Sequence, residues 1–423
     1  MRIDAKRHDG ASRTTRCGIP AIRRVLAPGT IIGVLLLPAP TAMAQVAGPF
    51  KLFVQETVSW DDNVYRLPSA SPDRPGSDVP QRGDTYYTTS AGVSFDVPFG
   101  RQHLLGNVTI NDSRYQTYSR LDYTGHDARL AWQWQAGNDA SGTLAYSDTS
   151  APQSFAGVQA RVTDLLRTKL ALASATFYGD RPLRLDVGAA WLDQTNGNWV
   201  NRYDNIDVLR ADVAISHVWP SKDSLGFVFR GEDGRYPERT GDITAVLPAA
   251  YRQYDTGATF DWKLTGLSRF RGNLEYASRR WDSHPERDWD GFVGYLQYDW
   301  NPSAKLSLSA IARRQINPYE TQKATFELTT GATLVPTWRP TERIDVVATL
   351  DYSERNYLGG PQAACGIAPG NNDRLASATL NLAWRPMRLV TLQVGGQYQD
   401  CSSGVPHAAY TAGVLSVGIR IGL

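Results

Sequence analysis

The last nine residues, 415–423, alternate without interruption between apolar side chains and small or polar ones. A β-strand has a period of two, so Leu415, Val417, Ile419, Ile421 and Leu423 would all share one face. A strand with one wholly apolar face suits lipid, where only a helix or a closed barrel satisfies every backbone polar group. The segment therefore favours a transmembrane β-barrel whose final strand pairs with its first. The final strand of a soluble sheet is the alternative.

The same segment contains a second pattern, formed by Ser416, Gly418, Ile421 and Leu423. This spacing resembles the C-terminal signal by which the barrel assembly machinery of the outer membrane recognises its clients. Leu423 departs from the usual pattern, in which Phe or Trp stands last. We therefore expect the assembly machinery and outer-membrane lipid as partners.

The opposite end of the chain has the pattern of an export signal. A basic segment reaching Arg24 is followed by the apolar run 25–37, and Ala42 and Ala44 form an A-x-A cleavage site. The apolar run is too short to span a bilayer well. We predict a signal peptide over 1–44 and one barrel domain over 45–423.

Charge and hydropathy exclude two classes of protein. Without residues 1–44 the chain has 37 Lys and Arg against 40 Asp and Glu, so a nucleic-acid partner is not expected. The mean hydropathy of −0.36 and the absence of a run of roughly 18 apolar residues exclude a helical membrane protein. A barrel is compatible with low hydropathy because every second residue faces water.

Short clusters of turn-forming residues recur along the chain. They lie at 98–101, 137–141, 179–182, 220–223, 265–268, 301–304, 339–342 and 385–387. An aromatic residue stands at or near the entry to most of them: Trp134, Tyr178, Trp219, Trp262, Trp300, Trp338 and Trp384. Successive aromatics are 44, 41, 43, 38, 38 and 46 residues apart. The chain therefore contains an internal repeat, with the aromatics marking a membrane interface.

Longer polar connections alternate with these short turns, for example at 61–84, 150–161, 232–249 and 358–372. The repeating unit is thus strand, short turn, strand, long loop, with strands of about 10–14 residues. Eight hairpins, a first strand at 50–60 and a last strand at about 407–423 predict an all-β antiparallel barrel of about 18 strands. Short turns and both termini would lie on the periplasmic side. A β-propeller has a similar period but needs four short strands per repeat.

Charged residues alternate with apolar ones in several of the predicted strands and would face the lumen. The candidates are Arg210, Asp212, Arg269, Arg271, Glu275, Arg279, Arg313, Arg343 and Asp345. Rings of charge set selectivity in pores. The alternative is that these residues pair with one another and only hold the wall in shape.

No catalytic constellation is visible in the sequence. The histidines after residue 44 are scattered, and no HExxH, GxSxG or phosphate-binding glycine loop is present. His284 stands among acidic residues in a predicted loop and would be the candidate if the barrel were a hydrolase, although a surface loop histidine is the preferred interpretation. We expect no enzyme activity, no metal and no cofactor.

Cys365 and Cys401 are the two cysteines that follow the predicted signal peptide. An even number of cysteines in an exported protein favours a disulfide. Cys365 is predicted in the external loop 358–372 and Cys401 at the start of the next external loop, so we expect a bridge between them rather than two free thiols.

The segment that follows the first predicted strand carries a family resemblance. Asp61, Asn63 and Arg66, within the D-x-N-aliphatic-aromatic-R-L pattern at 61–67, resemble the EpsL family of outer-membrane barrels encoded with exopolysaccharide biosynthesis machinery. The resemblance implies a porin-like role in polysaccharide export, with polysaccharide and periplasmic export components as partners. It supplies no catalytic residues. A general diffusion porin is the alternative, and a secreted propeller-type binding protein is a more distant one. Asp61 and Asn63 would cap the first external turn.

Overall fold

The computed structural model describes residues 49–68, 81–153, 155, 163–179, 182–321, 324–358, 372–404 and 409–422. The predicted signal peptide, Cys365 and Leu423 lie outside these residues. No helix in the described ranges is long and apolar enough to cross a membrane.

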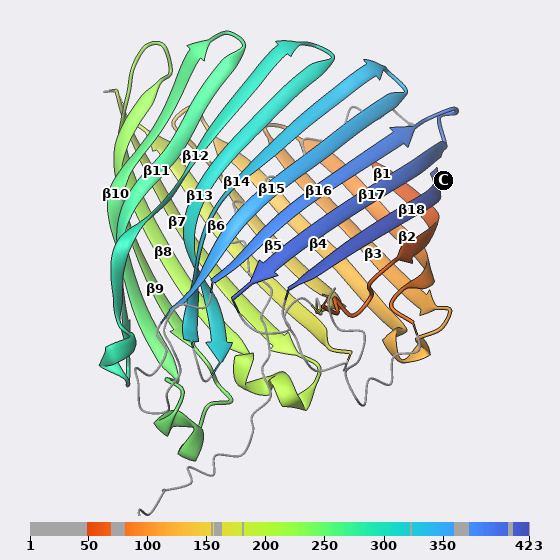
Figure 1. The fold of residues 1–423 in the computed structure, drawn as a ribbon. Coiled ribbons are helices and arrows are strands. Elements are labelled where there is room, and N and C mark those ends of the chain that lie inside the picture. Colours follow the sequence, from red (N-terminus) through yellow and green to blue (C-terminus); the bar gives the residue numbers. More distant parts are fainter. Residues whose placement is uncertain are drawn as a thin grey trace, which may run out of the picture.

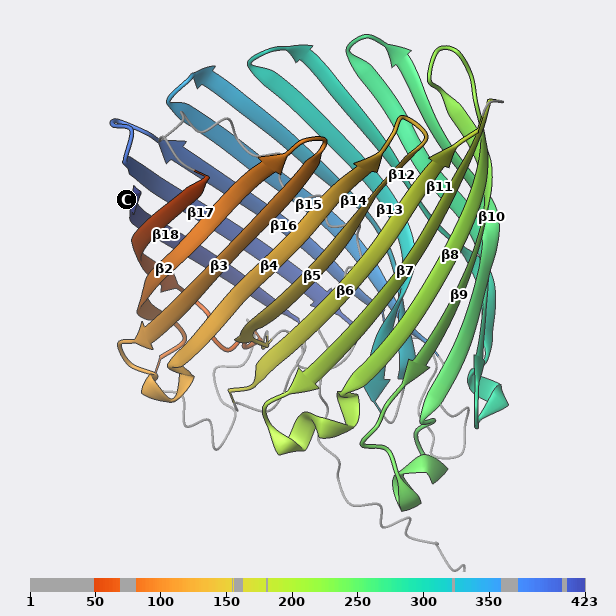
Figure 2. The same ribbon diagram turned by 180° about the vertical axis from the view of Figure 1, so that it is seen from behind.

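Eighteen strands form one antiparallel sheet that closes on itself, because β18 pairs with β1 (Figures 1 and 2). The strands are β1 (Phe50–Asp61), β2 (Asp84–Phe99), β3 (Gln102–Tyr115), β4 (Tyr123–Ala136), β5 (Ala140–Pro152), β6 (Leu165–Tyr178), β7 (Leu183–Asn196), β8 (Ile206–Val218), β9 (Ser224–Arg235), β10 (Ala250–Thr265), β11 (Ser268–Trp281), β12 (Trp289–Ser303), β13 (Leu306–Thr321), β14 (Ala324–Thr341), β15 (Ile344–Leu358), β16 (Asn372–Trp384), β17 (Val390–Ser403) and β18 (Tyr410–Gly422). Each strand pairs with its neighbours in the chain. The predicted fold class and strand number are confirmed, and the propeller is excluded.

The eight predicted short turns connect consecutive strands at one end of the barrel, which we call the short-turn end. The longer connections lie at the opposite, long-loop end (Figure 1). The strands are longer than expected, with 12 to 18 residues each. About 9–11 residues suffice for a tilted membrane strand. The excess length comes from the polar ends of the strands, which continue the sheet into water beyond the membrane.

The outer face of the barrel is apolar. On β18, the side chains of Leu415, Val417, Ile419 and Ile421 are all exposed, with exposed fractions from 42% to 62%. At the short-turn end, six of the seven repeat aromatics are exposed on the outer face. A second set of exposed aromatics lies toward the long-loop end: Trp60, Tyr87, Tyr146, Tyr254, Tyr276, Phe292, Tyr352 and Tyr398. Two aromatic belts that bracket an apolar band are the signature of a barrel placed in a bilayer.

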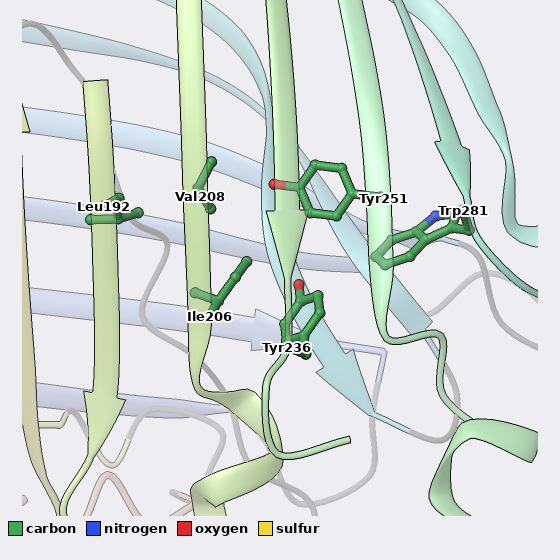
Figure 3. Packing of buried hydrophobic residues seen from close by; sticks show 6 residues of the cluster. All are labelled: Leu192, Ile206, Val208, Tyr236, Tyr251 and Trp281. Carbon is green, nitrogen blue, oxygen red and sulfur yellow. The ribbon is translucent and has the colours of Figure 1, made fainter. Parts of the chain in front are cut away.

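Four short 3-10 helices, which the sequence did not predict, lie in the described long-loop connections. They are η1 (Ser119–Leu121), η2 (Trp199–Asp204), η3 (Gly241–Ala245) and η4 (Pro285–Arg287). Buried apolar side chains gather at this end rather than at the barrel centre. One cluster comprises Leu192, Ile206, Val208, Tyr236, Tyr251 and Trp281 (Figure 3). The other comprises Val64, Tyr65, Tyr118 and Leu121.

Candidate functional site

The inner face of the barrel divides into two chemically different stretches. The inner face consists of the side chains that alternate along each strand with the exposed apolar residues. Residues that are partners in the strand register share a face, so the inner face can be followed from each strand to the next. We call the inner face of β8–β15 the charged wall. We call the inner face of β16–β18 and β1–β3 the amide wall, because amide and hydroxyl side chains dominate it.

Ion pairs neutralise the centre of the charged wall. The Arg230 guanidinium lies 2.6 Å from a Glu275 carboxylate oxygen and 3.8 Å from an Asp255 oxygen. Glu275 is completely buried, and Asp255 is 4% exposed. Gln253 donates an amide hydrogen to Asp255 at 2.8 Å. Buried carboxylates need such partners, since an unpaired buried charge is strongly destabilising.

Arg279 joins this centre to the apolar cluster at the long-loop end. It donates from Nε to Gln253 Oε1 at 2.7 Å, and its guanidinium carbon lies 4.1 Å from the centroid of the Tyr251 ring. Tyr251 in turn donates its hydroxyl to Glu232 at 2.7 Å. Arg279 is only 2% exposed, yet its Nη1 makes no hydrogen bond to another described residue.

A second tier of paired charges lies nearer the short-turn end. It consists of Arg269 with Asp261, Arg271 with Asp299, Arg313 with Asp351, and Asp345 with Arg339 and Arg385. Opposite charges on nearby strands thus pair with one another around this part of the wall. The arrangement supports the structural role that the sequence left open for these residues.

The predicted lumen residues do not all occupy the same kind of position. Arg210 and Asp212 lie on the inner face of β8, opposite Glu232 and Arg230 in the register with β9. Arg343 is an exception, because it lies in the turn between β14 and β15 and donates to the Pro386 carbonyl oxygen at 3.5 Å. It therefore lies at the short-turn mouth rather than within a strand of the wall.

The sequence candidates omitted Arg230, Glu232 and Asp255, which belong to the same cluster. The alternation around them was visible, since the exposed Leu225, Phe227 and Phe229 define the outer face of β9. Extending that alternation by one further residue would have placed Arg230 inside.

The amide wall has few charges over most of its height. Its inner-face residues include Gln393, Gln397, Gln399, Ser377, Thr379, Asn381, Ser416, Gln55, Thr57, Thr88, Ser90, Asn107, Thr109 and Asn111. Gln55 donates to Gln393 at 3.2 Å, and Ser90 donates to Asn111 at 2.7 Å. The side-chain amides of Gln397 and Gln399 make no hydrogen bond to another described residue. This wall therefore presents donors and acceptors to the lumen.

The motif at Asp61, Asn63 and Arg66 lies at the long-loop end, beside the junction of β1 and β18. Asp61 accepts the backbone N–H of Asn63 at 2.9 Å and forms an ion pair with Arg66 at 2.8 Å. Asn63 accepts the N–H of Leu67 at 2.8 Å and donates to the carbonyl oxygen of Thr411 at 2.8 Å. Arg66 adopts a positive φ of 53°. The motif holds the first turn and ties it to the last strand.

His284 links the connection between β11 and β12 to the connection between β9 and β10. Its Nε2 lies 3.0 Å from the Thr244 carbonyl oxygen, and its Nδ1 lies 3.1 Å from Glu286. The Glu286 backbone N–H and then His284 hold the pKa of the Glu286 carboxyl below its ordinary value. These contacts give His284 a role in loop structure.

No cluster in the described ranges offers three or more His, Cys, Asp or Glu ligands to a metal ion. Cys401 lies within β17 rather than at the start of a loop, on the inner face opposite Leu375. Its predicted partner Cys365 is outside the described residues, so the disulfide stays a prediction.

Comparison with known proteins gives a family match over part of the chain. Residues 252–423, from β10 to the C-terminus, match the family described as "Putative beta-barrel porin 2". None of the curated proteins matches the sequence. Neither finding bears on the resemblance to the EpsL family.

Several solved outer-membrane proteins are similar in structure at low identity. Pseudomonas aeruginosa OpdL has 10% identity and a TM-score of 0.42, with 89% of this chain and 98% of that chain covered. P. aeruginosa OccK9 (OpdG) has 10% identity and a TM-score of 0.44, with 88% and 98% covered. The siderophore receptor PirA from Acinetobacter baumannii has 8% identity and a TM-score of 0.44, with 90% and 81% covered.

The closed sheet, the apolar outer face and the porin family match agree with one another. The chain folds as a porin-like antiparallel β-barrel of the bacterial outer membrane.

Proposed function

We propose that this barrel is a conduit through which an exopolysaccharide crosses the outer membrane. The observation that carries the proposal is the amide wall, which lines one side of the lumen with Gln, Asn, Ser and Thr side chains. Such groups donate and accept hydrogen bonds at the same time, as sugar hydroxyls do. The resemblance of the segment at 61–67 to the EpsL family supports the same role.

Weak and repeated contacts suit a polymer that must move. A hydrogen bond formed in exchange for one to water contributes only about 0.5–1.5 kcal/mol. A sugar chain in contact with Gln397 and Gln399 could therefore leave one amide and bind the next without a deep energy minimum. Passage through a pore requires binding of this kind, favourable enough for entry and weak enough for release.

The charged wall supports a polymer of low charge. Its carboxylates and guanidiniums pair with one another, as in Arg230 with Glu275 and Arg313 with Asp351. Paired charges project little net field into the lumen. The wall therefore offers little attraction to a strongly acidic chain, and we propose that the cargo is neutral or weakly charged.

Conductance across a planar bilayer tests this function. The conductance of the purified barrel is measured in the presence of neutral and acidic polysaccharides of matched length. The wild type is compared with a double variant in which Gln397 and Gln399 are both changed to Leu. We expect open-channel current that neutral polymers block, and a block several-fold weaker in the double variant. Gln116→Leu, a change to an exposed glutamine outside the wall, serves as the control and should leave the block unchanged.

Two results would contradict the proposal. Current that no polymer blocks would identify a general diffusion porin for small solutes. A folded, membrane-inserted barrel without current would mean that the protein does not conduct, and the transport role would be withdrawn.

A further inference from the structure

Two arginines lie on the outer face of the barrel just beyond the aromatic belt of the long-loop end. Arg235 is the last residue of β9, and Arg252 lies near the start of β10. Each shares the outer face of its strand with an exposed aromatic residue, Phe229 on β9 and Tyr254 on β10. The Arg235 and Arg252 side chains are each 71% exposed. We call these two side chains the arginine pair.

A single carboxylate holds the arginine pair. Asp233 lies two residues before Arg235 on the same face, and it stands opposite Arg252 in the register of β9 and β10. Its two carboxylate oxygens lie 2.8 Å from Arg235 Nε and 3.5 Å from Arg252 Nε. One negative charge therefore faces two positive charges, and the group keeps a net positive charge.

The terminal nitrogens of both guanidiniums are left for another partner. Arg235 and Arg252 are held through Nε, and within the described part of the chain neither of them donates a hydrogen bond from Nη1 or Nη2. A guanidinium has five N–H donors, and four of them are on these terminal nitrogens. The arginine pair therefore presents most of its donors to the surroundings of the barrel.

The position of Arg252 is unfavourable for the sheet alone. Arg252 stands directly opposite Arg280 in the register of β10 and β11. Arg280 directs its own guanidinium to Asp290, at 2.8 Å. Like charges directly opposite one another in a sheet are destabilising. An anion bound at the arginine pair would offset this repulsion.

The depth of the arginine pair corresponds to that of lipid headgroups. Arg252 lies two residues beyond Tyr254, a distance of about 7 Å along the strand. Tyr254 belongs to the aromatic belt, and such belts lie at the level of the headgroups. On the side of the bilayer centre, Phe229 stacks on Tyr254 with ring centroids 6.2 Å apart, and Phe227 is 60% exposed. A lipid at this place would meet the arginines with its headgroup and the phenylalanines with its acyl chains.

We propose that the arginine pair binds a phosphate group of lipid A, the phosphorylated sugar lipid of the outer leaflet. Guanidinium forks bind phosphate oxygens through two parallel hydrogen bonds, which adds geometric specificity to the charge attraction. The proposal places the long-loop end at the outer surface of the membrane, as the sequence predicts. The site lies on the outside of the barrel and is independent of the polysaccharide passage through the lumen.

Binding of defined lipids to the purified barrel tests this site. Lipids retained by the detergent-solubilised protein are counted by native mass spectrometry. Three probes are compared, namely lipid A with its phosphates, the same lipid without phosphate, and phosphatidylglycerol. The test variant carries Arg235→Gln and Arg252→Gln. The matched control carries Arg101→Gln and Arg388→Gln, which remove the same charge from exposed positions at the short-turn end.

Folding of both variants is checked by heat modifiability and by urea unfolding in vesicles of phosphatidylcholine, which contain no lipid A. Neither measurement should change, because all four side chains are exposed.

We expect the wild type and the control to retain phosphorylated lipid A, and the test variant to retain several-fold less. Removal of the phosphates from the lipid should lower its retention by the wild type to a similar extent. Equal retention of lipid A by the wild type and the test variant would overturn the proposal, as would equal retention of the lipid with and without phosphate. Phosphatidylglycerol retained as well as lipid A would show a site for any anionic lipid and would overturn the assignment to lipid A.

Discussion

The β1–β18 junction and the β12–β13 junction both end their backbone pairing before the long-loop end of the barrel, and they differ beyond their last paired residues. Strands β1 and β18 pair from Phe53 opposite Gly422 to Asp61 opposite Val414. Strands β12 and β13 stop pairing at Gly294. At the first junction other hydrogen bonds continue where the ladder ends, whereas at the second the strands separate.

The junction of β1 and β18 is closed by the residues that come directly after β1. Asp62 gives its backbone N–H to Gly413 at 3.0 Å and accepts the Gly413 N–H on its carboxylate at 2.7 Å. Asn63 adds its bond to the Thr411 carbonyl oxygen. The turn that follows β1 therefore forms hydrogen bonds with the backbone groups of β18 beyond the last paired residues of the two strands.

The junction of β12 and β13 has a single comparable bond among the described residues, from Arg314 to the Phe292 carbonyl oxygen. The comparison teaches that closure at the end of a barrel depends on local side chains as well as on the strand count. One junction is continued by a turn motif, and at the other Trp289 of β12 packs on the buried Phe326 of β14.

The largest loss of stability is expected from Gly294→Ala, which would remove the kink in β12. The new Cβ would lie 2.3 Å from the Asn273 carbonyl oxygen at a φ that only glycine adopts readily. Strain and overpacking together should destabilise the barrel by about 3 kcal/mol or more. The temperature at which heat modifiability is lost on SDS gels measures the change.

Gly396→Ala is the matched control for this substitution. Its Cβ would meet only the flexible end of Leu415, at 3.6 Å, so the melting temperature should hardly change. An equal loss in both variants would show that the kink at Gly294 is not a special feature of the junction between β12 and β13.

A smaller loss of stability is expected from Asn63→Ala, which would open the junction between β1 and β18. Asn63 is 2% exposed, and its side chain bonds to the backbone of Leu67 and Thr411. Each buried backbone group left without a partner costs about 1–3 kcal/mol. Urea unfolding in lipid vesicles should therefore shift to lower denaturant concentration.

Two further variants sharpen the result at Asn63. Asn63→Asp keeps an acceptor for the Leu67 N–H but places a buried carboxylate oxygen against the carbonyl oxygens of Leu67 and Thr411, so its stability should be no higher than that of Asn63→Ala. Asn381→Ala, at an exposed position on the amide wall, should leave stability unchanged. If Asn63→Ala unfolds like wild type, the turn does not close the junction.

The contrast between the two junctions also explains which features the sequence could predict. Alternation and turn residues are local signals, so they gave the strand number, the short turns and the inward direction of residues such as Arg210 and Asp212. The contacts of Asn63 with Thr411 join positions 348 residues apart, and no local pattern specifies them. The role of Gly294 could not be predicted from the sequence either. A glycine within a strand pattern does not show from which neighbouring strand the chain diverges.

The charged wall shows the same limit at the candidate site. The sequence placed Glu275 and Arg279 inside but could not say whether they face a solute or one another. Their pairing with Arg230 and Glu232 depends on the register of β9, β10 and β11 and on side-chain reach across two strands.

The smallest effect on stability, and the sharpest test of the comparison, is expected from Arg314→Ala. Its bond to the Phe292 carbonyl oxygen lies at the exposed edge of the junction between β12 and β13, so its loss should change stability by no more than about 1 kcal/mol. Urea unfolding in lipid vesicles measures this change. Arg252→Ala, which removes an exposed arginine from the outer face of β10, is the control and should leave stability unchanged. A large loss of stability in Arg314→Ala would mean that this arginine closes its junction as the turn motif closes the other, and the difference between the two junctions would disappear.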